Sequence, residues 1–426
     1  MLKNIRMKRG VVMNDLLLEA NRCYLCKNPR CKANCPIDTP IPEIIELYKE
    51  GKIEEAGEKL FANNPLSLVC AIVCPHEDQC KGNCIRGIKD EPVRFCDIER
   101  NISKYYLDNI SLQKEAELDD RIAIVGGGPA GITIALILAK KGYKITLFDS
   151  HDKIGGVLRY GIPEFRLPKS IIDKYEERLK ELGVKIRPNT LIGPVLTLDK
   201  LLNDGYKAIF IGTGVWNPKT LDIKGESLGN VHYAIDYLKS PSVYDLGKRV
   251  CIIGAGDVAM DAARIAKRNG AKEVYVLYRK GMENIPATKA ELQGAIDDGV
   301  KFELFKSPLE LKEEGVVYIE TRNEIDENGK INTVAIEGKE GLFECDSIII
   351  AVSQSPKNNI VSNTTGLETN KWGLLLTDEY GHTTKKGVFA SGDVVTGAKT
   401  VVRAASHAKI VAEQIEKYIK ENKTQA

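Results

Sequence analysis

Nine of the eleven cysteines in this 426-residue sequence lie before residue 100. Seven of them form two patterns, Cys23-x2-Cys26-x4-Cys31-x3-Cys35-Pro36 and Cys74-x5-Cys80-x3-Cys84. Zinc sites usually use two separated pairs of ligands, often with histidine. Several thiolates in one short segment that ends in Cys-Pro are instead typical of ferredoxin-type sites, where the Cys-Pro cysteine binds the other of two clusters. The spacing therefore favours two [4Fe–4S] clusters that exchange ligands between the two segments, with zinc or no metal as alternatives.

A glycine-rich turn carries a second kind of chemistry. The apolar run Ile122–Val125 predicts a buried strand, and a helix-forming run and a second strand ending in Asp149 come after it. Between the first strand and the helix stand Gly126, Gly128 and Gly131. Such glycines let the backbone approach a pyrophosphate, the helix N-terminus offers free N–H groups, and an acid in the position of Asp149 binds a ribose. A dinucleotide site is therefore predicted here rather than a plain glycine turn.

The same pattern occurs again from Arg249 onward. A strand over Val250–Ile253 leads into Gly254-x-Gly256-Asp257-x-Ala259, followed by a helix to Lys267 and a strand over Glu273–Tyr278. Alanine is permitted at the third position, which serves helix–strand packing. The second strand ends in Arg279 and Lys280 instead of an acid, which favours the 2′-phosphate of NADP(H) over NAD(H). A solvated pair of surface cations is the alternative.

The length and composition set the frame for these sites. A chain of this length is expected to form two or three domains. The net charge of +2 argues against nucleic acid or a membrane surface as the main partner. No apolar run is long enough to span a membrane, and the N-terminus lacks the pattern of a secretory signal, so we expect a cytoplasmic protein. Helical spacing over Glu43–Phe61, broken at Gly51, predicts two short helices in an N-terminal module with little core of its own.

Several motifs together resemble a known family. They are the cysteine patterns, NPLSLVCAIVCP (64–75), GGVLRYGIPEFRLPKS (155–170) and GDVAMDAAR (256–264). Over nearly the whole chain the sequence is similar to the small subunit of NADPH-dependent glutamate synthase. It also resembles the small subunit of bacterial NAD-dependent dihydropyrimidine dehydrogenase, the N-terminal half of the eukaryotic enzyme, and the large subunit of the NADH-dependent ferredoxin:NADP oxidoreductase. The resemblance implies FAD, an NAD(P)H site and two [4Fe–4S] clusters.

The resemblance also implies a division of the cluster ligands. One cluster would be held by Cys35, Cys74, Cys80 and Cys84. The other would use Cys23, Cys26 and Cys31 with a non-cysteine ligand, for which Glu99 is the best match. Cys96 lies one helical turn before Glu99 and is the softer donor, so it stays an alternative. Cys70 would then be a buried thiol without a cluster role.

Further residues are expected at the flavin by the same resemblance. Gly155, Gly156 and Gly161 would lie in the segment that wraps the flavin, and Gly214 in the turn that closes the first half of the FAD domain. Gly392-Asp393 follows a short apolar strand, and Asp393 would bind the ribityl hydroxyls ahead of a helix over 401–417. A hairpin over 316–337, with a turn at Asp326-Glu327-Asn328-Gly329, belongs to the second nucleotide domain.

These expectations define an α/β architecture with two Rossmann-like dinucleotide-binding domains behind an α-helical iron–sulfur domain. The expected limits are 1–115 for the iron–sulfur domain, 116–217 with 352–426 for the FAD domain, and 218–351 for the inserted NAD(P)H domain. The expected function is electron transfer between NAD(P)H and a partner, either a larger catalytic or electron-accepting subunit or a ferredoxin. Hydride transfer between the two cofactors needs no protein acid or base, so no catalytic side chain is expected. A flavin and iron–sulfur redox sensor without turnover is the second class.

Overall fold

The fold is described from a computed structural model, which covers residues 15–325, 327 and 331–424. The chain separates into two compact units, and each is described by itself. One unit contains residues 216–355 with 159–164, and the other contains the remaining described residues. Of the turn expected at Asp326-Glu327-Asn328-Gly329, all but Glu327 lies outside the described residues.

The larger unit begins with a helical module. After a helix over 15–21, its helices are α2 (Arg30–Ala33), α3 (Ile41–Lys49), α4 (Ile53–Asn63), α5 (Ser67–Val73), the 3₁₀ helix η1 (Ile85–Ile88) and α6 (Phe95–Asn109). The expected break at Gly51 is confirmed, because this glycine has φ +75° between α3 and α4. The apolar faces of these helices meet in a core that contains Ile44, Leu60 and Ile98.

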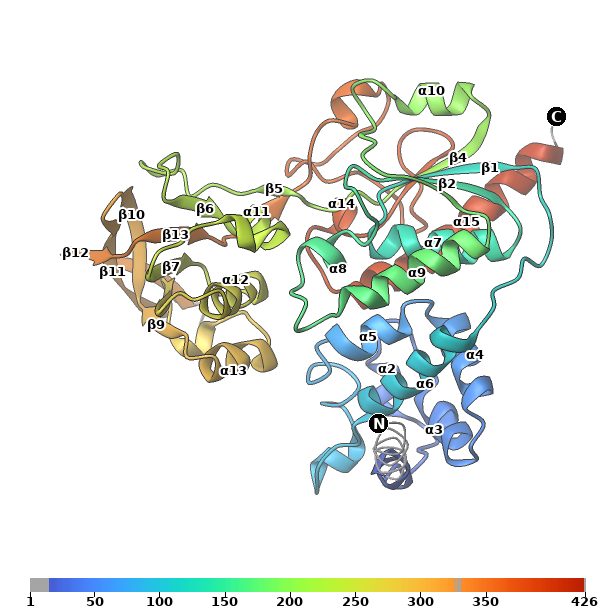
Figure 1. Cartoon of the computed structure of the whole chain (residues 1–426), viewed down its shortest axis with the longest axis horizontal. Helices are drawn as coiled ribbons and strands as arrows, with labels where there is room; N and C mark the ends of the chain where they lie inside the picture. Colours follow the sequence, from blue (N-terminus) through green and yellow to red (C-terminus); the bar gives the residue numbers. More distant parts are fainter. Residues whose placement is uncertain (1–14, 326, 328–330, 425–426) are drawn as a thin grey trace. The chain divides into compact units, whose positions relative to one another are not determined.

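A five-stranded parallel sheet follows in the same unit. Its order is β15-β4-β1-β2-β3, with β1 Arg121–Val125, β2 Lys144–Phe148, β3 Lys185–Arg187, β4 Tyr206–Ile211 and β15 Val388–Ala390. Its helices are α7 (Pro129–Lys140), α9 (Lys169–Glu181), α10 (Leu198–Asn203), α14 (Asp393–Thr396) and α15 (Val401–Thr424), and α8 (Val157–Tyr160) begins in this unit and ends in the segment 159–164 of the smaller one. In Figure 1, α7, α9 and α15 lie between this sheet and the N-terminal module, and α10 lies on the other side of the sheet. β15, which precedes Gly392-Asp393, pairs with β4. It therefore completes the same sheet as β1, the strand that leads into the first glycine turn.

The smaller unit is built on a second parallel sheet of five strands. Its order is β6-β13-β7-β8-β9, with β6 Val231–Tyr233, β7 Arg249–Ile253, β8 Glu273–Tyr278, β9 Lys301–Leu304 and β13 Ser347–Ile350. Its helices are α11 (Ala234–Lys239), α12 (Asp257–Arg268) and α13 (Lys289–Asp297). The expected hairpin is present as β11 (Gly315–Ile325) and β12 (Ile331–Glu344), which pair antiparallel and continue into β10 (Lys306–Lys312). The remaining strands β5 (Asn217–Pro218) and β14 (Gln354–Ser355) pair with each other.

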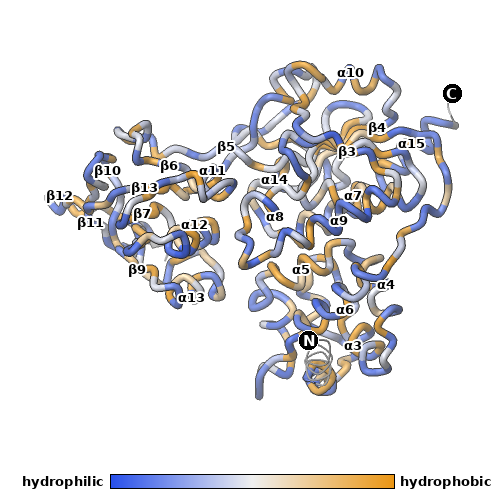
Figure 2. Tube along the Cα trace, viewed as in Figure 1, coloured by the Kyte–Doolittle hydropathy of each residue, from blue (hydrophilic) through white to orange (hydrophobic). Residues whose placement is uncertain are grey.

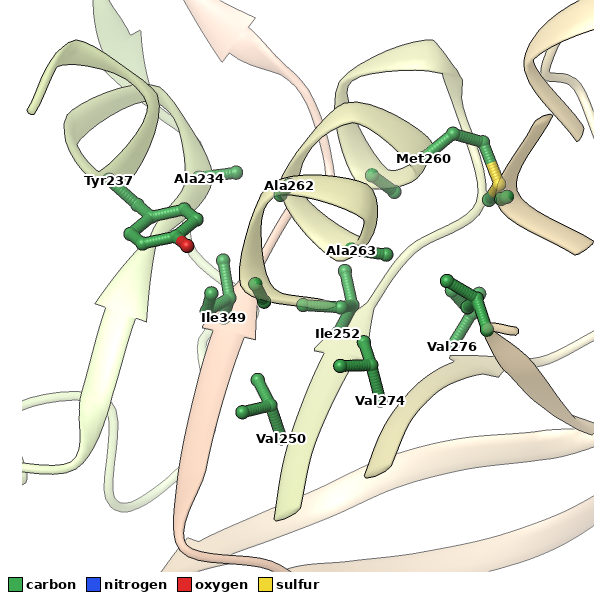
Figure 3. Close-up of a cluster of buried hydrophobic side chains, with 14 of the residues drawn as sticks. Ala234, Tyr237, Val250, Ile252, Met260, Ala262, Ala263, Val274, Val276 and Ile349 are labelled. Atoms are coloured by element: carbon green, nitrogen blue, oxygen red, sulfur yellow. The ribbon is translucent and has the colours of Figure 1, made fainter. Parts of the chain in front are cut away.

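Hydrophobic side chains hold each layer in place. Figure 2 shows orange segments concentrated in the sheets and in the helices that cover them. In the smaller unit, Ile252 of β7 and Ile349 of β13 point toward Ala262 and Ala263 of α12 (Figure 3). The small alanines let this helix approach the sheet closely, and Tyr237 of α11 fills the space beside it. No helix among the described residues is long and apolar enough to cross a membrane.

We expect Ile252→Ala to lower the free energy of unfolding by about 2–5 kcal/mol, because Ile252 is fully buried and its loss leaves a cavity between β7 and α12. Ile296→Ala is the matched control on α13, where the side chain is 43% exposed. Its effect should stay within about 0.5 kcal/mol. Denaturant unfolding followed by far-ultraviolet circular dichroism measures both, and equal losses would contradict the assignment of Ile252 to the core.

Candidate functional site

The first glycine turn connects β1 to the N-terminus of α7. Gly126 has φ +103°, and a Cβ there would lie 2.5 Å from the Gly212 carbonyl oxygen. A Cβ on Gly131 would lie 2.0 Å from the Gly126 carbonyl oxygen. At Gly128, by contrast, the nearest atom would be 3.9 Å away. Two glycines are therefore needed for the turn and for helix packing, while the middle one leaves room for a group such as a pyrophosphate.

The amide groups at the start of α7 are available to an anion. Gly128 is the N-cap of α7 and provides no side-chain cap, so the first helical N–H groups stay free. Gly155 donates its N–H to the Gly127 carbonyl oxygen at 2.7 Å, and a Cβ on Gly156 would lie 2.8 Å from the Gly128 Cα. The backbone of Gly155-Gly156 thus packs directly on that of Gly127-Gly128. Such close backbone packing beside a free helix N-terminus is expected at a dinucleotide site.

Asp149 has a role that the sequence did not indicate. Its Oδ2 accepts a hydrogen bond from the Gly127 N–H at 2.7 Å, and its Oδ1 accepts one from the His151 N–H at 2.8 Å. The carboxylate therefore fixes the glycine turn to the end of β2. Its binding to a ribose stays a prediction, for which lone pairs of the same oxygens are still available.

The remaining glycines of the expected flavin site lie at chain turns. Gly214 has φ +70° after β4, and Gly392 has φ +77° before α14. Gly161 is buried just after α8 and belongs to the smaller unit. Their contacts with a flavin stay predictions.

Asp393 lines a cavity of about 570 Å³ in the larger unit. Burial raises the pKa of this carboxyl to about 6, although the Lys399 N–H donates to its Oδ1 at 3.1 Å. The cavity extends from Asp393 along the first turns of α15 to the cysteine segment, and its other polar or ligand side chains include Cys35, Lys399, Arg403 and His407. His407 was not expected here, and its Nδ1 lies 2.9 Å from the Ser391 Oγ.

The second glycine turn repeats the geometry of the first. Gly254 has φ +120°, and a Cβ there would lie 2.4 Å from the Ala351 carbonyl oxygen. A Cβ on Gly256 would have no atom within 4 Å. Ala259 is fully buried at the third position, and Asp257 accepts a hydrogen bond from the Thr288 N–H at 2.8 Å. This turn therefore also leaves its middle glycine open for a phosphate group.

Arg279 and Lys280 stand at the end of β8, as expected. Arg279 is exposed and makes no ion pair with any described residue, and Lys280 likewise makes none there. Their backbone is held in place, because the Arg279 carbonyl oxygen accepts from the Thr321 Oγ at 2.8 Å. The guanidinium is thus free to bind a phosphate.

The seven patterned cysteines fall into two groups. In the first, burial and the nearby Cys23, Cys84 and Cys26 together raise the pKa of Cys31 to about 11. Cys23 is affected in the same way by Cys26 and Cys84. In the second group, a side-chain hydrogen bond with Cys70, burial and the nearby Glu99 raise the pKa of Cys74. Burial, Glu99 and Cys35 raise that of Cys80.

This grouping of neighbouring side chains differs from the division of ligands that we expected. Cys84 lies with Cys23, Cys26 and Cys31, and Glu99 lies with Cys35, Cys74 and Cys80. The cause is a tight turn over 76–82, in which the His76 carbonyl oxygen accepts from Lys81 and Gly82. A Cβ on Gly82 would lie 1.6 Å from the Glu77 carbonyl oxygen. The turn separates Cys80 from Cys84 and directs them to different groups.

Three further groups surround the second set. Glu99 is 6% exposed, and burial raises its pKa well above the ordinary value. Cys96 also lies near Cys80, and the side chains of Cys70 and Cys74 share a hydrogen bond. All eleven cysteines are free thiols. Among the described residues no three His, Cys, Asp or Glu side chains converge on a single metal-ion position.

The donors present fit iron–sulfur clusters in number and kind. The first group offers four thiols, and the second offers three thiols with a buried carboxyl at its side. Thiolate sets of this kind are the usual ligands of [4Fe–4S] clusters. Together with two open dinucleotide cradles, they define a flavoprotein oxidoreductase of the two-dinucleotide-domain class joined to an iron–sulfur module.

Comparisons with known proteins give the family. Residues 120–408 match the model of the pyridine nucleotide-disulphide oxidoreductases, and residues 3–110 match that of dihydropyrimidine dehydrogenase domain II, 4Fe-4S cluster. The small chain of glutamate synthase (NADPH) from Halomonas elongata is 33% identical over 95% of this chain and 91% of its own length. The chain belongs to the glutamate synthase small-subunit family of these oxidoreductases. It is an NAD(P)H-dependent flavin and iron–sulfur oxidoreductase with a 4Fe–4S domain.

Two other relatives extend this comparison. The NADPH-Fe(3+) oxidoreductase subunit beta of Geobacter sulfurreducens is 30% identical. The match covers 92% of this chain and 64% of that protein. FprA of Mycobacterium tuberculosis, solved in complex with NADPH, aligns with a TM-score of 0.62 at 18% identity over 72% of this chain and 86% of its own. The second likeness concerns the fold alone.

The two glycines of the second turn should respond differently to the addition of a methyl group. Gly256→Ala should leave the free energy of unfolding within about 0.5 kcal/mol of wild type, because its Cβ meets open space. It should weaken NADPH binding about tenfold, or about 1.4 kcal/mol, because that space is needed by the pyrophosphate. Gly254→Ala should instead destabilise the fold by more than about 1 kcal/mol, since φ is positive and the carbonyl of Ala351 is in the way.

Thermal unfolding without nucleotide and titration with NADPH separate these effects. Unchanged NADPH affinity in Gly256→Ala would contradict the placement of the phosphate at this turn.

Proposed function

We propose that the chain is an electron-transfer subunit that moves electrons between NADP(H) and a partner protein. FAD would be bound at the first glycine turn and two [4Fe–4S] clusters by the two thiol groups. The observation that carries the proposal is the position of the second thiol group, which packs directly against the part of the larger unit that holds Asp393. Relatives named as a small chain and as a beta subunit support a role within a larger assembly.

The second thiol group packs closely against α15, the helix that follows Asp393. Ile37 and Cys70 form one buried cluster with Val402 and Ala405 of α15, and Cys35 and Cys74 pack at its edge. The Ser406 Oγ donates to the Pro36 carbonyl oxygen at 2.8 Å. Tyr175 of α9 is 1% exposed, and burial and the nearby Cys70 raise its pKa. These contacts hold the second group beside the cavity that Asp393 lines.

The chemistry would come from the cofactors. FAD accepts two electrons as a hydride and can release them singly, which matches one-electron clusters. The chain's own residues would bind and orient: the glycine turns position the pyrophosphates, Asp393 binds the ribityl chain, and the apolar contact with α15 keeps water from the space between flavin and thiols. The second thiol group would be the nearer relay to the flavin, and the first group the more distant one.

The final electron acceptor or donor would belong to the partner and lie outside this chain. A glutamate synthase large subunit is the first candidate, since the chain covers most of its small-chain relative. An electron-transfer subunit of dihydropyrimidine dehydrogenase or of a ferredoxin:NAD(P) oxidoreductase is the second candidate, favoured by the match of residues 3–110. In each case the cysteine module would face the partner.

The purified chain should oxidise NADPH with a viologen as acceptor. Anaerobic preparations should contain about eight iron and eight acid-labile sulfide per chain, from two four-iron clusters. Rapid turnover together with this iron content supports the electron-transfer subunit. Bound FAD and iron without viologen reduction would instead support a redox sensor, and zinc in place of iron would contradict the cluster assignment.

Arg279→Ala should raise KM for NADPH while leaving that for NADH nearly unchanged. Loss of one charge-assisted contact to the 2′-phosphate costs about 1.5–3 kcal/mol, or roughly ten- to a hundredfold. Arg322→Ala is a suitable control, because Arg322 is an exposed arginine of the same unit that pairs with Glu324. Equal effects of Arg279→Ala on both nucleotides would show that this side chain does not bind the phosphate.

Glu99→Ala should change the EPR signal of the cluster at Cys35, Cys74 and Cys80, and leave reduction of FAD by NADPH intact. A carboxylate is a harder donor than a thiolate, so its cluster should differ in potential from the all-cysteine neighbour. Cys96→Ala is the matched variant one turn away and should leave both signals in place. Loss of a signal in Cys96→Ala but not in Glu99→Ala would assign the ligand to the thiol.

A further inference from the structure

A bulky aromatic residue has a strained backbone at the end of β9. Phe305 has φ +54°, in the left-handed region. Residues with a Cβ seldom adopt this region, because the Cβ is crowded by the following carbonyl oxygen, and for a bulky side chain it is an outlier. Strain of this kind persists only where the surrounding structure imposes it, and it is concentrated at ligand sites.

Hydrogen bonds from two neighbouring strands impose this conformation. The Phe305 N–H donates to the Lys280 carbonyl oxygen at 3.4 Å, and the Phe305 carbonyl oxygen accepts from the Thr321 N–H at 2.8 Å. The Thr321 Oγ donates to the Arg279 carbonyl oxygen at 2.8 Å. Thr321 is buried, and it therefore joins the end of β8 to the end of β9.

The cores of the smaller unit do not explain why this residue is a phenylalanine. Phe305 is 36% exposed. Among the described residues, the two buried clusters of this unit, one around Ile252 and one around Ile350, neither include Phe305 nor have it packed against them. Glycine or asparagine could form the same backbone hydrogen bonds with less strain. The ring therefore adds strain to the chain without joining either core.

The position of Phe305 in the sheet indicates a ligand for the ring. The strands β7, β8 and β9 are parallel neighbours, so their carboxyl ends lie side by side. The register pairs Tyr278 with Leu304, which puts Phe305 beside Arg279 on strands about 5 Å apart. A dinucleotide with its pyrophosphate at the turn after β7 and its 2′-phosphate at Arg279 carries its adenine on that same ribose. The adenine thus comes within reach of the end of β9.

We propose that Phe305 is the residue on which the adenine of NADP(H) stacks. The proposal rests on the function proposed above, because it takes the second glycine turn and Arg279 as the NADP(H) site. An adenine offers a flat aromatic face, and stacking on an aromatic side chain strengthens binding about tenfold. Thr321 fixes the backbone of Arg279 relative to that of Phe305, so the 2′-phosphate and the base are recognised together.

A purely structural role for the ring is the other explanation. The ring would then shield the hydrogen bonds of Thr321, and its loss would loosen the end of β8. Nucleotide affinity would follow the stability of the variants, and the loss would fall on the 2′-phosphate contact of Arg279. Stacking predicts instead that affinity follows the presence of an aromatic ring, and that NADPH and NADH are affected equally because both carry adenine.

The experiment uses the full chain with its cofactors and three variants at one position. Phe305→Ala removes the ring, Phe305→Asn removes it and also relieves the strain, and Phe305→Tyr keeps an aromatic ring. The matched control is Leu342→Ala, because Leu342 is 43% exposed on β12 and pairs with Val317 of β11, four residues from Thr321. Calorimetry measures binding of 2′,5′-ADP, the viologen assay gives KM for NADPH and NADH, and thermal unfolding without nucleotide gives the stability.

We expect Phe305→Ala and Phe305→Asn to bind 2′,5′-ADP about tenfold more weakly, and to raise KM for NADPH and for NADH by the same factor. Phe305→Asn should unfold at a higher temperature than Phe305→Ala and still bind no better, since relief of strain does not restore the ring. Phe305→Tyr and Leu342→Ala should bind 2′,5′-ADP as the wild type does.

Other outcomes overturn the proposal. Wild-type affinity in Phe305→Ala, or affinity that recovers with stability in Phe305→Asn, would show that the ring does not bind the base. A rise in KM for NADPH alone would show that the ring only supports Arg279. If the wild type does not bind 2′,5′-ADP and Arg279→Ala leaves both KM values unchanged, the proposed NADP(H) site itself is wrong, and the stacking assignment falls with it.

Discussion

The packing of one cysteine segment against the start of α15 is the contact on which the rest of the larger unit depends. The buried cluster of Ile37, Cys70, Val402 and Ala405 joins the N-terminal module to the helix that follows Asp393. Polar contacts at its border, from Ser406 to Pro36 and from Lys409 to Asn63, fix the register of the two surfaces. The module of short helices has a small core of its own, and this contact adds buried surface to it.

Two constraints on the glycine turns explain why they recur in both sheets. The chain must reverse tightly between a buried strand and a helix, which requires positive φ at Gly126 and Gly254. The helix must also start without a side-chain cap, because its free N–H groups are needed by the ligand. Each turn therefore gives up local stabilisation in order to keep a site open.

Much of this architecture could be predicted from the sequence. The strands before Gly126 and Gly254 and the helix break at Gly51 follow from apolar periodicity and glycine chemistry, which act over a few residues. The role of Asp149 could not be predicted in full, because its bond to Gly127 depends on how β2 lies beside the turn. The free state of Arg279 likewise depends on which acids the fold brings near it.

The division of the cysteines shows the limit most clearly. Spacing predicted which cysteines are candidate ligands, but it could not tell which segments would meet. Cys80 and Cys84 are close in sequence, yet the reversal at Gly82 sends them to different groups. The three-dimensional path of residues 76–84 places Cys84 with the first group and Cys80 with the second, near Glu99.

Burial of the donor groups links their charge to the metal they would hold. Desolvation raises the pKa values of the Cys31, Cys80 and Glu99 side chains, so without metal these groups are favoured in their protonated form. Metal binding requires the deprotonated form and therefore releases protons as it proceeds. The positive charge of iron then replaces the protons as the partner of these buried anions. Because the helices around them have a small core, the same binding free energy also stabilises the fold of the N-terminal module.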